Sequence, residues 1–249
     1  MFVPRQNPYF YQHQEKTVEQ RFSLLCWNIH KENTTPHFQS KLYELLHTHP
    51  SDFLLFQEYK MPKHQGHDLS ALSYAMAANI ETKRHIYGLM TASYSSFDTK
   101  HIELTHQKEF LISTKKSTLL TSHTFFDGKA LHLLNMHGIN FVSSKVFNKE
   151  LEKIKLILSS CSGALIVCGD FNNWSKKRIK ALEEFQTELS LQKAEIEGGH
   201  HIKHVFAKPI DHIFYRDLKL IKAEAIDTKN ISDHNPIHAT FERLNSSGI

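Results

Sequence analysis

Apolar runs of strand length and helix-like stretches alternate near the N-terminus. Residues 22–28 form one apolar run, and a second covers residues 52–57. Between them, apolar side chains recur at helical spacing from Pro36 until His49 and Pro50 end the pattern. A strand, a helix and a strand within about 35 residues are typical of a parallel crossover unit.

The pattern changes after the second strand. Leucine, methionine and alanine side chains at helical spacing predict a helix over residues 68–80. Between residues 86 and 136 the apolar runs are short and are broken by polar turns, with Asp127-Gly128 as the clearest hairpin turn. This segment predicts an antiparallel meander built from the runs IYGLMTASY, HIELT, EFLIST, TLLTSHTFF and ALHLLNM.

Helical periods return in the second half of the chain. Residues 144–160 and 175–189 each place apolar side chains on one face of a helix, and the apolar run 164–168 lies between them. Three short strands are predicted beyond these helices, around Ile213, Leu220 and Ile237. We therefore expect a mixed α/β fold.

Composition supports a globular protein without a membrane span. The 249 residues are 40% hydrophobic and 22% charged, which excludes a disordered chain, and nine glycines with seven prolines exclude a collagen-like one. No apolar run approaches the ~18 residues of a spanning helix, and residues 1–20 lack the apolar stretch of a signal peptide. We expect a cytoplasmic protein, favour a monomer, and assign residues 1–21 to a polar arm and 22–249 to one domain.

Charge and cysteine content add weaker constraints. The net charge is +4, and 19 histidines add to it below neutral pH, which mildly favours a polyanionic partner. Cys26, Cys161 and Cys168 form no CxxC pair, and their odd number argues against a closed disulfide framework. We expect a reducing compartment, with Cys26 and Cys168 as buried thiols inside apolar runs.

Polar side chains of a few types stand where the predicted strands end. Ligands usually bind at the strand ends of an open α/β sheet. Each residue taken alone also has a structural interpretation: a glutamate after a strand is commonly solvated, and the GDFN turn at residues 169–172 is placed to cap the following helix. The set consists of Asn28, Glu58, His137, Asp170, Asn172, Asp211, Asp233 and His234.

Together these residues indicate one kind of chemistry. Glu58, Asp170 and Asp233 offer oxygen ligands suited to Mg²⁺ or Mn²⁺, whereas a zinc site would need clustered histidine or cysteine. Asp211 is placed to hold His234 in one tautomer, as a catalytic imidazole requires. A hard cation, an oriented water and an imidazole suit phosphoester hydrolysis.

The order of the motifs resembles the endonuclease/exonuclease/phosphatase superfamily, the DNase I-like Mg²⁺-dependent hydrolases. The resemblance runs from residue 22 to residue 241, nearly the whole chain. The sequence around the motifs is most similar to the bacterial YafD-like branch. This resemblance does not indicate a substrate. The six motifs, in the order that the superfamily has them, are CWNIHKEN, DFLLFQE, NMHG, GDFN, IDHIF and SDHNP.

The resemblance implies a four-layer α/β sandwich, in which two mixed β-sheets pack face to face with helices outside. The active site is then expected at one edge of the pair of sheets. Carried over by motif, Glu58 binds the metal, Asn28 stands beside it, and Asp233 supports the metal site.

The catalytic roles follow from the same resemblance. Asp170 positions or deprotonates the attacking water, and Asn172 helps to hold the nucleophile and the phosphate. His137 donates to a phosphoryl oxygen. Asp211 orients His234, which is either the general base or a cation that stabilises the phosphate.

One departure from the superfamily concerns a fixed cation. Many relatives carry a Ser-Arg or Ser-Lys pair before a proline after the fourth strand, whereas here Ser93 is followed by Tyr94-Ser95-Ser96. Lys31 is a candidate replacement, although its simpler interpretation is an exposed loop charge.

Three functions are consistent with these residues. A nuclease acting on nucleic acid is favoured by the net charge, by Lys176-Lys177-Arg178 beside the GDFN turn, and by Trp174 as a possible stacking residue. A phosphatase of a small phosphorylated metabolite or lipid headgroup is the alternative. An inactive relative that only binds is disfavoured, because the motif residues are all present.

Overall fold

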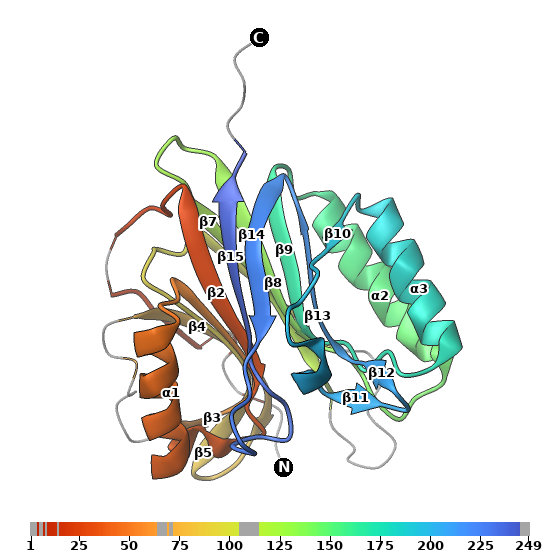
Figure 1. Ribbon diagram of the computed structural model, residues 1–249, viewed down its shortest axis with the longest axis horizontal. Coiled ribbons are helices and arrows are strands. Elements are labelled where there is room, and N and C mark those ends of the chain that lie inside the picture. The colour runs from red at the N-terminus through yellow and green to blue at the C-terminus, as the bar shows by residue number, and fades with distance from the viewer. Residues whose placement is uncertain are drawn as a thin grey trace.

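Two β-sheets pack face to face, with helices on both outer faces (Figure 1). This computed structural model describes residues 4, 7, 9–13, 15–63, 69, 72–104 and 115–244. Helix, sheet, sheet and helix form the four layers expected of the DNase I-like sandwich, so the predicted fold class is confirmed.

The first sheet has seven strands in the order β1-β4-β5-β3-β2-β15-β14. The pair β2 and β3 is parallel and is joined by helix α1, which confirms the predicted crossover unit. The strands are β1 (Tyr9–Tyr11), β2 (Arg21–Asn28), β3 (Phe53–Pro62), β4 (Ser73–Glu81), β5 (His85–Ser93), β14 (Leu218–Ala225) and β15 (Ile237–Arg243).

The second sheet has six strands in the order β10-β13-β9-β8-β7-β6. β8 and β9 are parallel, while β13 runs antiparallel to β9 and places Asp211 opposite Asp170. A separate hairpin is formed by β11 (His204–Val205) and β12 (Lys208–Pro209). The strands of the sheet are β6 (Thr99–Leu104), β7 (Ser117–Thr124), β8 (Ala130–His137), β9 (Ala164–Asp170), β10 (Gln192–Lys193) and β13 (Asp211–Arg216).

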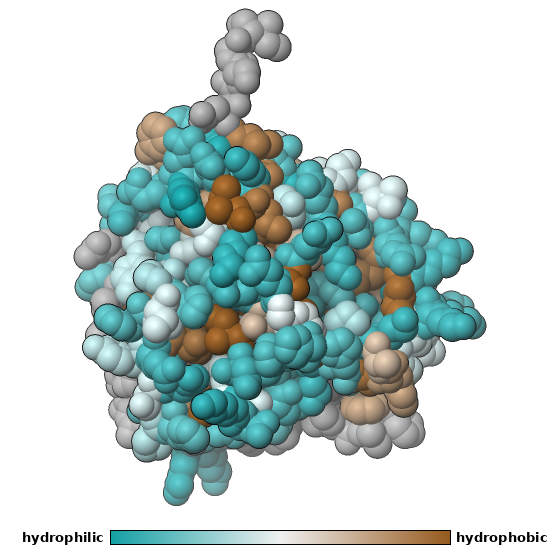
Figure 2. Space-filling model, viewed as in Figure 1, coloured by the Kyte–Doolittle hydropathy of each residue, from teal (hydrophilic) through white to brown (hydrophobic). Residues whose placement is uncertain are grey.

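Three α-helices and two 3₁₀ turns complete the described chain. Helix α1 (Pro36–Thr48) covers the first sheet, whereas α2 (Ser144–Ser159) and α3 (Lys176–Glu188) cover the second. The 3₁₀ turns are η1 (Glu32–Thr34) and η2 (Gly199–His201). Within the described residues, no helix combines the length and the apolar character that crossing a membrane requires. Figure 2 shows a mainly hydrophilic face, with hydrophobic residues in small separate groups.

Two of the predictions from residue patterns are wrong. The segment expected to be a helix at residues 68–80 contains strand β4, because Ala75 and Ala77 pack between the sheets while Met76 and Ala78 pack on the opposite face. Burial on both faces erases the alternation that normally marks a strand. The expected single meander is divided: β5 belongs to the first sheet and β6, β7 and β8 to the second. The run EFLIST lies outside the described residues.

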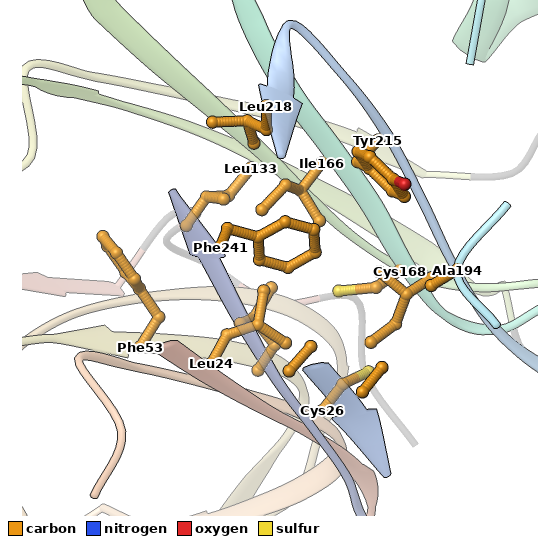
Figure 3. Close-up of a cluster of buried hydrophobic side chains, with 14 of the residues drawn as sticks. Leu24, Cys26, Phe53, Leu133, Ile166, Cys168, Ala194, Tyr215, Leu218 and Phe241 are labelled. Atoms are coloured by element: carbon orange, nitrogen blue, oxygen red, sulfur yellow. The ribbon is translucent and has the colours of Figure 1, made fainter. Parts of the chain in front are cut away.

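The main core lies between the two sheets (Figure 3). Phe22, Leu24 and Phe53 from the first sheet meet Leu133 and Ile166 from the second, and all five are at most 2% exposed. Burying a large apolar side chain contributes roughly 1.5–3 kcal/mol, so this layer fixes how the sheets face each other. As expected, Cys26 and Cys168 are buried here as free thiols.

The N-terminal segment is attached to the sandwich at two points. β1 pairs with β4 through Tyr9↔Met76, and Val18 forms a bridge with Phe125. These contacts hold the described part of the predicted arm against both sheets.

We predict that the buried imidazole of His123 makes stability depend on pH. It packs between Phe53 and Phe97, and burial lowers the pKa of His123 to about 3. Below pH 6.5 the unfolded chain binds a proton that the folded chain rejects, so the free energy of unfolding falls as the pH drops, by about 1.4 kcal/mol per unit from this residue.

Urea unfolding of the wild type and of His123→Gln at pH 7, 6, 5 and 4 measures this contribution. The variant should lose stability less steeply between pH 6 and pH 4. His47→Gln, which alters an exposed histidine, should keep the wild-type slope. Equal slopes for the wild type and His123→Gln would show that His123 does not cause the pH dependence.

Candidate active site

The carboxylate of Asp170 is the point at which the candidate residues converge. Asp170 ends β9 and is 3% exposed. Asn28 Nδ2 donates to Asp170 Oδ2 at 3.2 Å, and the backbone N–H of Asn172 donates to Oδ1 at 3.0 Å. The Nε2 atoms of His137 and His234 lie 3.4 and 3.8 Å from Oδ2. Four strand ends and loops, far apart in sequence, therefore meet at one buried carboxylate.

Gly169 allows Asp170 to occupy this position. Its φ is 139°, and a Cβ atom added there would lie 1.9 Å from the carbonyl oxygen of Met136 on the neighbouring strand β8. Only glycine fits so close an approach. Glycine at this position of the GDFN turn therefore lets β9 deliver the carboxylate beside His137, the last residue of β8.

The imidazole of His234 is held by Asp211. His234 Nδ1 donates to Asp211 Oδ2 at 2.8 Å, which leaves Nε2 facing Asp170. Trp27 Nε1 donates to the carbonyl oxygen of His234 at 2.8 Å and fixes the loop that carries it. Burial opposes a charge on this ring, but Asp211, with help from Asp170 and Asp233, outweighs it and raises the pKa of His234 to about 9. His234 is therefore an imidazolium at neutral pH.

At Asp170 and His137 burial outweighs the neighbouring charges and shifts the pKa of each group in favour of its neutral form. It raises the pKa of Asp170, an effect that the charged His234 opposes and Asp211 reinforces. It also lowers the pKa of His137 to about 4, and the charge of Lys116 adds to that effect. Lys116 Nζ lies 3.1 Å from His137 Nε2, and because an ammonium can only donate, Nε2 accepts and the ring is neutral.

Glu58 enters the site through an irregularity in β3. The register between β3 and β5 shifts between Phe56 and Tyr59, and Glu58 has a left-handed φ of 56°. A bulge of this kind redirects a side chain out of the regular ladder. The β-bulge at Glu58 thus directs its carboxylate to within 4.0 Å of His137 Nε2.

Two lysines keep Glu58 ionised. Lys31 Nζ lies 2.7 Å from Glu58 Oε2, and Lys116 Nζ lies 4.0 Å from Oε1. Burial opposes the charge, yet His137 and these lysines lower the pKa of Glu58 to about 2. Since His137 is itself neutral at pH 7, we assign the effect to the lysines. The four residues line a cavity of about 70 Å³, together with Tyr87 and Gly88.

Lys31 was expected from the sequence as a candidate cation, but Lys116 was not. Lys116 follows another lysine just before β7, a position typical of solvated charges, yet its side chain is only 12% exposed. Its place beside His137 depends on the pairing of β7 with β8, which the sequence does not reveal.

The other candidate residues lie around this centre. Asn172 has a left-handed φ of 49°, and its side-chain amide donates to the carbonyl oxygen of Gly138 at 3.0 Å. Asp233 is half-buried and pairs with Lys203 at 3.1 Å. Helix α3 is capped by Ser175 and not by the GDFN turn, so the capping alternative for that turn is wrong.

The expected basic cluster beside the GDFN turn is only partly exposed. Lys176 and Lys177 are exposed, but Arg178 is 1% exposed. The Arg178 guanidinium donates to the carbonyl oxygens of Ile139 and Asn172, at 3.1 and 2.7 Å, and it therefore organises the loops instead of facing a substrate.

The donor set fits a hard divalent cation. Asp170, Asp211 and His234 each offer one ligand atom, and these atoms lie within 4.8 Å of one another. Glu58 adds an ionised carboxylate close by. Oxygen donors of this kind suit Mg²⁺ or Mn²⁺. Asp211 is bonded to His234, and Glu58 is paired with Lys31.

A family model described as the Endonuclease/Exonuclease/phosphatase family matches residues 25–234. A UPF0294 protein of Photorhabdus laumondii is 31% identical over 222 residues, which is 88% of this chain and 82% of the relative. A UPF0294 protein of Yersinia pseudotuberculosis is 38% identical over 137 residues, 55% of this chain. That alignment spans about half of the relative, 52% of its length.

Solved structures match over most of the chain. An endonuclease/exonuclease/phosphatase family protein from Leptotrichia buccalis has a TM-score of 0.67 at 16% identity, covering 89% of this chain and 99% of that one. The human Nocturnin catalytic domain with bound sulfate has a TM-score of 0.66 at 13% identity, covering 98% and 100%. At these identities the likeness concerns the fold, whereas the family model over residues 25–234 confirms the resemblance to the superfamily.

We predict that Asp211→Asn lowers the pKa of His234. The substitution removes the charge that opposes the burial penalty but keeps the shape of the side chain. Titration of the His234 ring resonances by NMR, in EDTA so that no divalent ion interferes, measures the pKa directly. Asp233→Asn is the matched control and should give a smaller decrease, since Asp233 has the weaker influence. An unchanged pKa in Asp211→Asn would refute the assignment.

Proposed function

Because the chain belongs to the endonuclease/exonuclease/phosphatase family, a family of phosphoester hydrolases, we propose that it is a Mg²⁺- or Mn²⁺-dependent phosphodiesterase that acts on nucleic acid. The observation that carries the proposal is the convergence on Asp170 of Asn28, His137 and His234, with the ionised Glu58 beside them. This arrangement provides a proton acceptor, a cation and a ligand for metal within one site.

Asp170 is the group that receives the proton of the attacking water. A buried carboxylate with a raised pKa is a stronger base than a solvated one. As the water oxygen bonds to phosphorus, its proton passes to Asp170. The bond from phosphorus to the leaving oxygen then breaks, and that oxygen takes a proton from solvent.

His234 acts on the phosphate, and His137 holds Lys116 beside it. His234 is an imidazolium, so it stabilises negative charge that develops on the phosphoryl oxygens, and this favours the cation role over the general-base role. His137 and Lys116 face the same region, where Lys116 supplies a fixed positive charge. Asn28 and Asn172 orient Asp170 through the hydrogen bonds that they donate to it.

Glu58 is the proposed principal metal ligand, with Asn28 beside it and Asp233 supporting the site. When bound, a divalent cation polarises the phosphoryl group and neutralises charge on the leaving oxygen. Lys31 and Lys116 keep the Glu58 carboxylate ionised. A divalent cation would take the place of one of these lysines.

Turnover of a substrate panel tests the proposed activity. With Mg²⁺ or Mn²⁺ we expect cleavage of DNA or RNA and of bis-p-nitrophenyl phosphate, and little turnover of p-nitrophenyl phosphate. Asp170→Asn, His137→Ala and His234→Ala should each lower kcat on the order of 10²-fold or more. Efficient monoester turnover without cleavage of any polynucleotide would instead identify a phosphatase of a small metabolite or headgroup.

We expect Glu58→Gln to weaken metal binding, since it removes one anionic oxygen with little change of shape. Calorimetric titration of Mn²⁺ into both proteins measures the affinity. Glu184→Gln, at an exposed position of α3, controls for the general loss of a negative charge. Unchanged affinity in Glu58→Gln would exclude Glu58 as a principal ligand.

A further inference from the structure

Three aromatic side chains stand at one border of the candidate active site, and we name them the aromatic rim: Phe141, Trp174 and Phe206. Phe206 is 80% exposed and Phe141 is 52% exposed. Exposed aromatic side chains that lie together form an apolar patch, and such patches commonly mark interaction sites. The rim is therefore the surface feature that the proposed chemistry leaves unexplained.

Phe206 is held outward by its own hairpin. It stands at the tip between β11 and β12, where Phe206 and Ala207 have left-handed φ values of 48° and 60°. Two-residue turns with this backbone normally contain glycine, asparagine or aspartate. A phenylalanine and an alanine here place an aromatic ring at the tip at the cost of backbone strain.

Trp174 is fixed in position. Its Nε1 donates to Asn140 Oδ1 at 3.0 Å, the guanidinium of Arg178 lies 4.8 Å from the ring centre, and the ring of Phe206 lies 5.8 Å away edge-on. Arg178 also donates to the carbonyl oxygens of Asn172 and Val142. One buried arginine thus joins the rim to the loop that orients Asp170.

The three segments that carry the rim contain no carboxylate. Residues 138–149, 171–182 and 198–210 include no aspartate or glutamate, although the whole chain has 26 against 30 lysines and arginines. Lys203 and Lys180 pair with acidic side chains outside these segments. The exposed lysines of the three segments are Lys145, Lys149, Lys176, Lys177, Lys180 and Lys208.

We propose that the aromatic rim binds single-stranded nucleic acid by stacking an unpaired base on Phe206 and Trp174, while the neighbouring lysines contact its phosphates. This inference rests on the proposed function and assigns its substrate class. A base presents a flat π-face to an aromatic ring, and the basic segments complement a polyanion. In a duplex the bases are already stacked on each other, so the rim selects unpaired nucleotides.

Fluorescence anisotropy with a labelled oligothymidylate tests the stacking contact. The titrations use the full chain in EDTA, so that no turnover occurs. Because stacking on an aromatic ring contributes to the binding of each base, Phe206→Ala should weaken binding on the order of 10-fold. Phe126→Ala removes a ring that is 67% exposed in the turn between β7 and β8, and it should bind like the wild type.

Two further measurements separate stacking from charge. An oligomer of the same length made of abasic spacers should bind more weakly and should not respond to Phe206→Ala. The double variant Lys176→Ala/Lys177→Ala should flatten the plot of log K against log salt, by about 0.7 per lost phosphate contact on a single strand, whereas Phe206→Ala should leave the slope unchanged.

Wild-type affinity for oligothymidylate in Phe206→Ala would overturn the proposal, as would equal affinity for a duplex of the same length. Phe206-dependent sedimentation with vesicles of anionic phospholipid, without binding of oligothymidylate, would overturn it in favour of a membrane surface. Binding is measured without hydrolysis, so its outcome is independent of the proposed activity. Stacking without cleavage of a phosphodiester would refute only the proposed activity. Cleavage without stacking would refute only the proposed role of the aromatic rim.

Discussion

The burial of one ionisable carboxylate is the constraint on which the rest of the site depends. Asp170 loses its solvation between the two sheets, and a buried carboxyl group persists only where neighbours compensate. Compensation comes from both halves of the sandwich: Asn28 ends β2 of the first sheet, whereas Asn172, which donates its backbone N–H, follows β9 of the second. The hydrogen bond between Asn28 and Asp170 therefore exists only when the sheets face each other in one register, which the packing of the inter-sheet core secures.

The same burial divides the titratable groups into distinct roles. Asp211 makes His234 cationic, whereas burial and Lys116 keep His137 neutral, although both rings approach the same Asp170 oxygen. Glu58 stays ionised because two lysines face it. Similar residue types thus differ in charge because their neighbours differ, and the site combines a carboxylate of raised pKa, an imidazolium and an ionised glutamate.

Much of the fold and of the candidate site could be predicted from the sequence. Apolar runs that end in polar residues predicted β2, β3 and β9, together with the candidate residues at their ends. A buried strand is apolar and the residues that follow it are polar, so the end of the strand is visible in the sequence. Strand β4 was not predicted, since alanines buried on both faces carry no alternation. Lys116 was not predicted, and Arg178 was expected to contact phosphate, for a related reason. A charged side chain becomes buried only when distant segments pair, and no local pattern records that pairing.

Arg178 links the aromatic rim to the turn that carries Asp170. Its guanidinium is buried under Trp174 and bonded to the backbone of Asn172, so the rim cannot shift without disturbing the turn that orients Asp170. A buried guanidinium is stable only while its donors are satisfied, and here backbone carbonyl oxygens satisfy them. The GDFN turn and the first turn of α3 therefore form one rigid unit, in which the position of a base stacked on Trp174 would be fixed relative to the Asp170 carboxylate.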